Sequence, residues 1–151
     1  MQESLDLQNT KKITEMNANQ IYVTLPVKDI QKTKEFWIKL GFSINEQMSG
    51  ETTVCVVIKE DTIYVMFGTE EVFQTYSNKP VPKMDTTQVL VTISLNSREE
   101  VDNVVNAALE NGAWQHEEPQ DYGWMYQNSF WDINGLGWNI MFADPSQLPP
   151  K

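Results

Sequence analysis

The chain has 151 residues, with 11 Lys and Arg against 21 Asp and Glu, and its formal net charge is −10. Hydrophobic residues make up 40% and aromatic residues 11% of it, a composition that excludes a disordered acidic tail. The acidic balance argues against nucleic acid as a partner, because phosphates favour Lys and Arg, and no apolar run reaches the ~18 residues that a membrane helix needs.

Cysteine content and charge indicate the compartment and the kind of partner. Cys55 is the single cysteine, so no disulfide forms within the chain, and no secretory signal opens it. We therefore expect a cytoplasmic protein. An acidic surface attracts cations, which favours a small molecule as the partner, a cationic one included. The alternative is that the charge only keeps the protein in solution.

The chain begins with a polar stretch. Residues 1–19 lack Gly and Pro and contain few large apolar positions, which predicts a loosely attached tail with a short helix around Leu5–Met16. From Gln20 to Leu25 the residues become β-branched and aromatic, which predicts a strand. Pro26 ends this strand because proline cannot donate to a strand ladder.

A helix and three strands follow and complete a first module over residues 20–67. Asp29 can cap a helix that runs to about Leu40, and Gly41 ends it. The apolar positions on or near its buried side are Ile30, Phe36, Trp37 and Leu40. The three strands are expected over residues 42–48, 52–59 and 62–67.

Residues 68–85 predict a long, irregular connector. A connection of this length inside a compact domain is usually functional or mobile. It carries two aromatic residues, Phe73 and Tyr76, and we interpret them as a lid over a ligand site.

A second module is predicted over residues 86–144, before a C-terminal tail at 145–151. Its first strand, over 86–95, alternates apolar and polar residues. Ser97 and Glu100 form a capping box for a helix that runs to Glu110. Three more strands are expected over residues 113–117, 123–131 and 137–143, the last two joined by an Asn134-Gly135 turn.

The order β-α-β-β-β therefore occurs twice, and local sequences agree with a repeat. Val23-Thr24-Leu25 precedes the first helix as Val91-Thr92-Ile93 precedes the second. Val65-Met66-Phe67 closes the first module as Ile140-Met141-Phe142 closes the second. Each module thus predicts a sheet with a helix against one face, and the other face is covered by the other half or surrounds a cavity.

Two signatures within this repeat resemble the vicinal oxygen chelate superfamily, which includes glyoxalase I, bleomycin-resistance proteins, fosfomycin-resistance enzymes and extradiol dioxygenases. One is Leu25-Pro-Val-Lys-Asp29 entering a helix that ends Lys39-Leu-Gly-Phe42; the other is Ser129-Phe-Trp-Asp-Ile-Asn-Gly135 before Trp138-Asn-Ile-Met141. The resemblance covers about residues 20–144. It implies an α+β fold whose two βαβββ modules form a curved mixed sheet around a cleft, and it implies a homodimer.

In the family's enzymes, four inward-facing His, Glu or Gln side chains hold a divalent metal that polarises the substrate. The resemblance places these positions at Tyr22, at Tyr64 or Met66, at Leu90 and at Asn139. Leucine has no ligating atom and Asn offers only a neutral oxygen, so we expect neither the family metal nor another cofactor.

Two further residues, His116 and Cys55, carry side chains that can bind a metal. His116, the single histidine, shares a strand face at most with Glu118, and we interpret it as a solvated strand end. Cys55 lies in an apolar run and is interpreted as core packing.

Strand alternation predicts which side chains line the cleft. The residues expected inside are Tyr22, Thr24, Tyr64, Met66, Leu90, Thr92, Ser94, Asn139 and Met141. An apolar, aromatic lining with a few hydroxyls and one amide is typical of a binding site. The strand over 123–131 puts Trp124, Tyr126, Asn128 and Phe130 on one face; Trp124 and Tyr126 either stack on a planar or cationic ligand or help to fill a core.

Three functions are consistent with these patterns. The first is a family member without the metal site that binds a small molecule, as a sequestering resistance protein or a sensor does. The second is a lyase, isomerase or dioxygenase-type enzyme of the same superfamily, which uses a divalent metal or metal-free acid/base chemistry. The third is a scaffold that dimerises or binds another protein.

Overall fold

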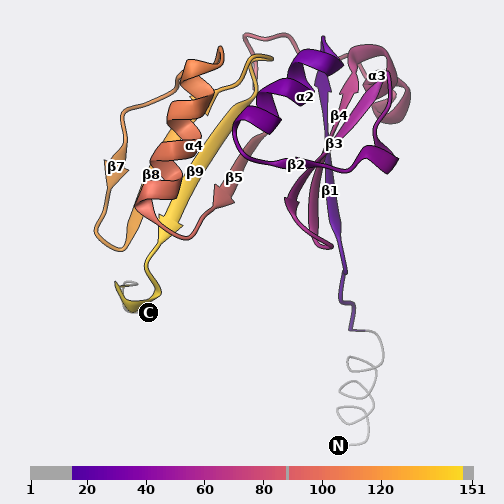
Figure 1. Ribbon diagram of the computed structural model, residues 1–151. Helices are drawn as coiled ribbons and strands as arrows, with labels where there is room; N and C mark the ends of the chain where they lie inside the picture. Colours follow the sequence, from indigo (N-terminus) through magenta and orange to yellow (C-terminus); the bar gives the residue numbers. More distant parts are fainter. Residues whose placement is uncertain (1–14, 88, 148–151) are drawn as a thin grey trace, which may run out of the picture.

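The computed structural model describes residues 15–87 and 89–147, and it confirms two successive βαβββ modules (Figure 1). The predicted tail helix around Leu5–Met16 lies almost entirely outside the described residues. The first module comprises β1 (Ile21–Val27), α2 (Ile30–Lys39), β2 (Ser43–Ile44), the 3-10 turn η1 (Glu46–Met48), β3 (Thr53–Lys59) and β4 (Ile63–Thr69). The second comprises β5 (Leu90–Ser94), α4 (Arg98–Glu110), β6 (Trp114–Gln115), β7 (Gln120–Asp121), β8 (Met125–Trp131) and β9 (Gly137–Ala143).

The two sheets repeat one topology. The first has the strand order β1-β4-β3-β2, and the second has the order β5-β9-β8-β6, with β7 paired to β8. In each sheet the first strand of the module runs parallel to its last strand, and the remaining pairs are antiparallel. β1 and β5 consequently both lie at a sheet edge.

The helices begin and end where their sequence signals predict. The Asp29 side chain accepts a hydrogen bond from the Lys32 backbone N–H at 2.9 Å, and Ser97 Oγ accepts one from the Glu100 N–H at 3.1 Å. Gly41 and Gly112 follow the helices with φ angles of +100° and +103°, a conformation that glycine adopts without a steric penalty.

One hydrophobic core joins both modules through the helix-facing sides of the two sheets. Trp37 of α2 is fully buried and stacks on Phe67 of β4, with ring centroids 5.7 Å apart. The same indole meets Trp138 of β9 edge-on at 4.6 Å, and Phe36 lies 6.2 Å from Phe130 of β8. The face of each sheet that is turned away from its helix therefore lies outside this shared core.

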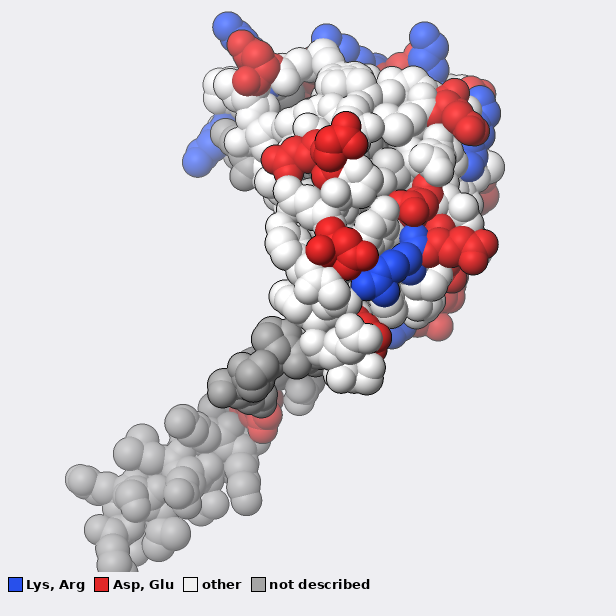
Figure 2. Space-filling model, turned by 90° about the vertical axis from the view of Figure 1, so that its left-hand side faces the viewer, with Lys and Arg blue, Asp and Glu red and all other residues white. Residues whose placement is uncertain are grey.

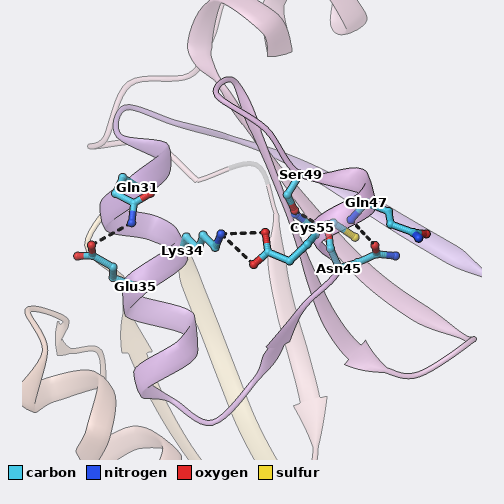
Figure 3. A network of polar contacts seen from close by, with 8 residues as sticks. Gln31, Lys34, Glu35, Asn45, Gln47, Ser49 and Cys55 are labelled. Atoms are coloured by element: carbon cyan, nitrogen blue, oxygen red, sulfur yellow. Dashed lines mark hydrogen bonds and ion pairs between the residues drawn. The ribbon is translucent and has the colours of Figure 1, made fainter.

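A polar network holds α2 against the start of the sheet (Figure 3). Lys34 Nζ forms an ion pair with Glu46 of η1 at 2.9 Å. Asn45 caps η1 by accepting from the Gln47 N–H, and Ser49 Oγ accepts from the Cys55 N–H at 3.0 Å. These bonds replace strand pairing, which explains why the strand predicted over 42–48 shortens to β2 and η1.

The connector differs most from its prediction. Residues 68 and 69 continue β4, and residues 70–77 form a helix, α3 (Glu70–Ser77), where an irregular connection was expected. Thr69 caps α3 by accepting from the Val72 N–H at 3.3 Å, and Asn78 ends it with a φ of +56°. The C-terminal segment begins with a short 3-10 turn, η2 (Pro145–Gln147).

None of the helices in the described part of the chain has the length and apolar character that a membrane crossing requires.

Candidate ligand-binding site

Tyr22 and Tyr64 lie side by side on the outer face of the first sheet, the face away from α2. Their strands pair Tyr22 with Tyr64 and Thr24 with Met66, and the two phenol rings stack at 4.8 Å with an interplanar angle of 13°. Burial raises the pKa of the Tyr64 hydroxyl and that of the Cys55 thiol nearby on β3, so both groups keep their protons at neutral pH. The predicted alternation in this sheet is confirmed.

The second sheet presents the matching predicted residues on its own outer face. Thr92 pairs with Asn139, Ser94 pairs with Met141, and Leu90 pairs with Gly137. Leu90 is half exposed, whereas Ile93, which alternates with these residues, is buried in the shared core. The two modules meet through their helix-facing sides. The residues around Tyr22 on the first sheet and those around Asn139 on the second sheet therefore lie on separate sheet faces.

The four positions aligned with the family's metal ligands do not form a donor set for a divalent ion. Phenol and thioether groups on one sheet and a leucine with a neutral amide on the other are not the ligands that hard divalent cations select. Across the described ranges 15–87 and 89–147, no three His, Cys, Asp or Glu side chains are grouped so that they could hold a metal ion. We derive no chemical step through a metal here.

Tyr126 lies on the side of β8 that faces α4, not on the side that carries Asn139 in the neighbouring strand. Its hydroxyl donates to Asp102 Oδ1 of α4 at 2.6 Å, and Asn128 Nδ2 approaches the same oxygen at 3.5 Å. Phe130, on the same strand face, is fully buried in the core. Ser129, on the opposite strand face, pairs with Asn139. The face of β8 that carries Tyr126, Asn128 and Phe130 therefore packs toward α4 and the core.

His116 is not a solvated strand end. Its ring lies 4.5 Å from the Trp131 ring, at an interplanar angle of 33°, and its Nδ1 atom is buried without a hydrogen-bond partner in the described part of the chain. The imidazole therefore packs as a flat ring on the indole.

A cavity of about 660 Å³ lies at the junction of the two modules. Its walls come from the carboxyl end of β1, the start of α3, the β8–β9 hairpin and the segment between α3 and β5, which contributes Val81, Pro82, Lys83, Met84, Thr86, Thr87 and Val89. Thr24 and Phe73 are the two predicted site residues that it brings together, whereas Tyr76 is not part of its lining. The apolar wall residues include Val23, Phe73, Val81, Met84, Val89 and Leu136.

Sequence reasoning did not anticipate Met84 and Gly135, which fix the cavity's shape. Gly135 has a φ of +80°, and a Cβ atom built there would come within 3.0 Å of the Met84 side chain. The absence of a side chain at Gly135 thus lets the connector lie directly on the hairpin. Asn134 Nδ2 donates to Thr33 Oγ1 at 3.1 Å and ties the hairpin to α2. The Asn134-Gly135 turn can be recognised in the sequence. Its contact with Met84 joins residues that are far apart in the chain, so the sequence does not indicate it.

β1 contributes its free edge to the cavity. The Ile21 N–H donates to Thr62 on the neighbouring side, so alternate residues from Ile21 onward bond to β4. The backbone groups of Tyr22, Thr24 and Pro26 therefore point to the other edge of β1, which pairs with no strand among the described residues. Pro26 has no N–H to leave unsatisfied there, which explains why β1 continues through it instead of ending as predicted. Thr24 leaves one backbone donor beside the cavity.

Comparison with known proteins identifies the family. The model of the Glyoxalase/Bleomycin resistance protein/Dioxygenase superfamily matches residues 19–148. The chain belongs to this superfamily. No curated protein sequence shows a significant match to this chain.

Solved structures share the superfamily fold. A hypothetical protein from S. aureus superposes with a TM-score of 0.72 at 25% identity, covering 88% of this chain and 99% of the other. A glyoxalase/bleomycin resistance protein/dioxygenase family enzyme from Burkholderia phytofirmans PsJN gives 0.68 at 19% identity, covering 83% and 99%. The bleomycin resistance determinant encoded on the transposon Tn5 gives 0.58 at 15% identity, covering 83% and 98%.

Proposed function

We propose that this superfamily member binds a small, largely apolar molecule in the cavity at its module junction. The observation that carries the proposal is the cavity of about 660 Å³, a volume within the range of ligand sites. Its lining combines aliphatic and aromatic side chains with a few polar groups, the composition that orients a mostly apolar guest. Phe73 of α3 supplies one ring against which a planar guest can pack.

The proposed role is sequestration or sensing. One structural neighbour is named as a bleomycin resistance determinant, so the fold occurs in a drug-resistance protein. The cavity lies between segments that are far apart in the sequence, so a guest there would contact both modules. Binding would consequently stabilise the junction as well as retain the guest.

The test is calorimetric and thermal titration with a neutral aromatic probe, naphthaleneethanol. Saturable binding should stabilise the fold by about 2.7 kcal/mol when the free probe is at a hundred times its Kd. Val89→Trp fills part of the cavity and should abolish binding. Ile38→Trp, at a similarly exposed position on α2, should leave it unchanged. No saturable binding to the wild-type protein, or equal binding to Val89→Trp, would contradict the proposal.

We also propose that the protein is a homodimer in which the outer face of the first sheet of each copy covers the outer face of the second sheet of the other copy. Large apolar side chains support this arrangement, because Tyr22 and Met48 on the first module are each 40% exposed. On the second sheet Leu90 is 50% and Trp114 is 45% exposed. Apolar surface of this kind favours association.

A further inference from the structure

We infer, on the basis of the proposed binding function, that the guest of the junction cavity is an amphipathic anion: an apolar body that carries a carboxylate held by Lys28 and Lys83. Both lysines line the cavity, and Glu70 is the one acidic residue among its described lining residues. The whole chain has almost twice as many acidic as basic residues. The cavity reverses this ratio.

The lining of an adjoining hollow also contains more lysines than acidic residues. It is about 430 Å³ in volume and shares Lys28, Met84 and Asn134 with the cavity. Lys32 and Lys39 of α2 also line it, together with Asp29 and Glu35. In Figure 2 several Lys and Arg side chains stand along the upper rim of the visible face, beside some Asp and Glu, and further Asp and Glu side chains lie on the face below. In Figure 1 the same end holds the start of α2 and the β8–β9 hairpin.

The acidic groups around these hollows already have partners. Asp29 accepts from the Lys32 backbone N–H at 2.9 Å, and Glu35 Oε1 accepts from Gln31 Nε2 at 3.0 Å (Figure 3). Glu70 lies in the first turn of α3, where the helix dipole favours an anion. These interactions reduce the negative potential that a second anion would meet.

The lysines, by contrast, are available. Lys34 is paired with Glu46 and Arg98 with Asp121, but within residues 15–87 and 89–147 neither Lys28 nor Lys83 forms an ion pair. Both are exposed at the cavity. The free-edge N–H of Thr24 adds an uncharged donor on the same wall. Two ammonium groups and a backbone N–H in the lining of one cavity favour a carboxylate, whereas the net charge of the chain alone favours a cation.

The experiment compares three probes that share one ring system: naphthaleneacetate, naphthaleneethanol and naphthaleneethylamine. Titration calorimetry on the full chain at low ionic strength should find the acetate bound most tightly and the amine least tightly. Lys28→Gln and Lys83→Gln should each weaken acetate binding about twofold to fivefold, the range expected for an exposed ion pair, and leave the alcohol unchanged. Added salt should weaken the acetate selectively, because it screens exposed charges.

Lys59→Gln is the matched control, since it removes the same charge at an exposed position outside the cavity lining. It should alter none of the three affinities, and circular dichroism should confirm that all variants fold. Equal affinity for the three probes, or an acetate affinity insensitive to Lys28→Gln and Lys83→Gln, would overturn the anion inference while leaving the proposed binding function intact. If none of the three probes binds, both proposals fail.

Discussion

Asp132 is a carboxylate buried within the β8–β9 hairpin, next to the cavity wall. Its Oδ1 accepts from the backbone N–H groups of Asn134 and Leu136 at 2.8 and 2.9 Å, and its Oδ2 accepts from Trp138 Nε1 at 2.8 Å. Burial raises the pKa of Asp132 to about 6, although these three donors each act to lower it. The carboxylate therefore shapes the turn and also makes the fold sensitive to pH.

The raised pKa sets the sign of a stability change. Between about pH 4 and pH 6 the folded protein keeps a proton on Asp132 that the unfolded chain has released. The contribution to the free energy of unfolding is fully present below this window and is lost by its upper end, a fall of about 3 kcal/mol for two pKa units. Urea unfolding across this range should show the fall in the wild-type protein and not in Asp132→Asn, which cannot titrate. Parallel pH profiles for the two proteins would contradict this expectation.

At the scale of a strand, Gly137 determines how side chains cover the outer face of the second sheet. A Cβ atom at Gly137 would come within 2.6 Å of Leu90 Cδ2 and 2.8 Å of Trp131 Cζ3. Leu90 is half exposed and can move, but the Trp131 indole is a rigid ring with His116 packed on it. Gly137 thus allows Trp131 to lie across the strand.

We expect Gly137→Ala to lower the free energy of unfolding by about 1–3 kcal/mol, because the indole must shift. Gly68→Ala in β4 is the matched substitution, since its Cβ atom would meet Val72 at an ordinary 3.5 Å and needs no movement. Its effect should stay within about 1 kcal/mol. Denaturant midpoints of the two variants provide the comparison, and equal losses of stability would show that strand glycine itself, not Trp131, is responsible.

The elements show how far sequence reasoning reaches. Caps such as Asp29 and Ser97, the glycines after the helices and the alternation in β1, β4, β5 and β9 are local signals, so both modules and their faces could be predicted. Alternation shows which residues of β8 share a face but not which face meets α4, so the position of Tyr126 beside Asp102 could not be predicted from it. The cavity could not be predicted, because Thr24, Met84 and Gly135 come together from three distant segments.

At the scale of the whole molecule, net charge and exposed apolar faces act in opposite directions on the proposed homodimer. Two chains of charge −10 repel each other, while burial of Tyr22 and Leu90 in the contact favours association. Salt screens the repulsion and leaves the apolar contribution in place. The dimer should consequently tighten as ionic strength rises, the opposite of the salt response expected for the acetate probe.

Sedimentation equilibrium at low and moderate salt measures this balance. Tyr22→Asp and Leu90→Asp each place a charge on one of the two outer faces and should shift the wild-type dimer toward monomer. Ile38→Asp introduces the same charge on α2, on the other side of the first sheet, at a position 49% exposed, and should leave the dimer unchanged. Because dimer formation covers both faces, either face variant alone should suffice. A wild-type monomer at every salt concentration, or dissociation by Ile38→Asp as well, would show that these faces do not form the contact.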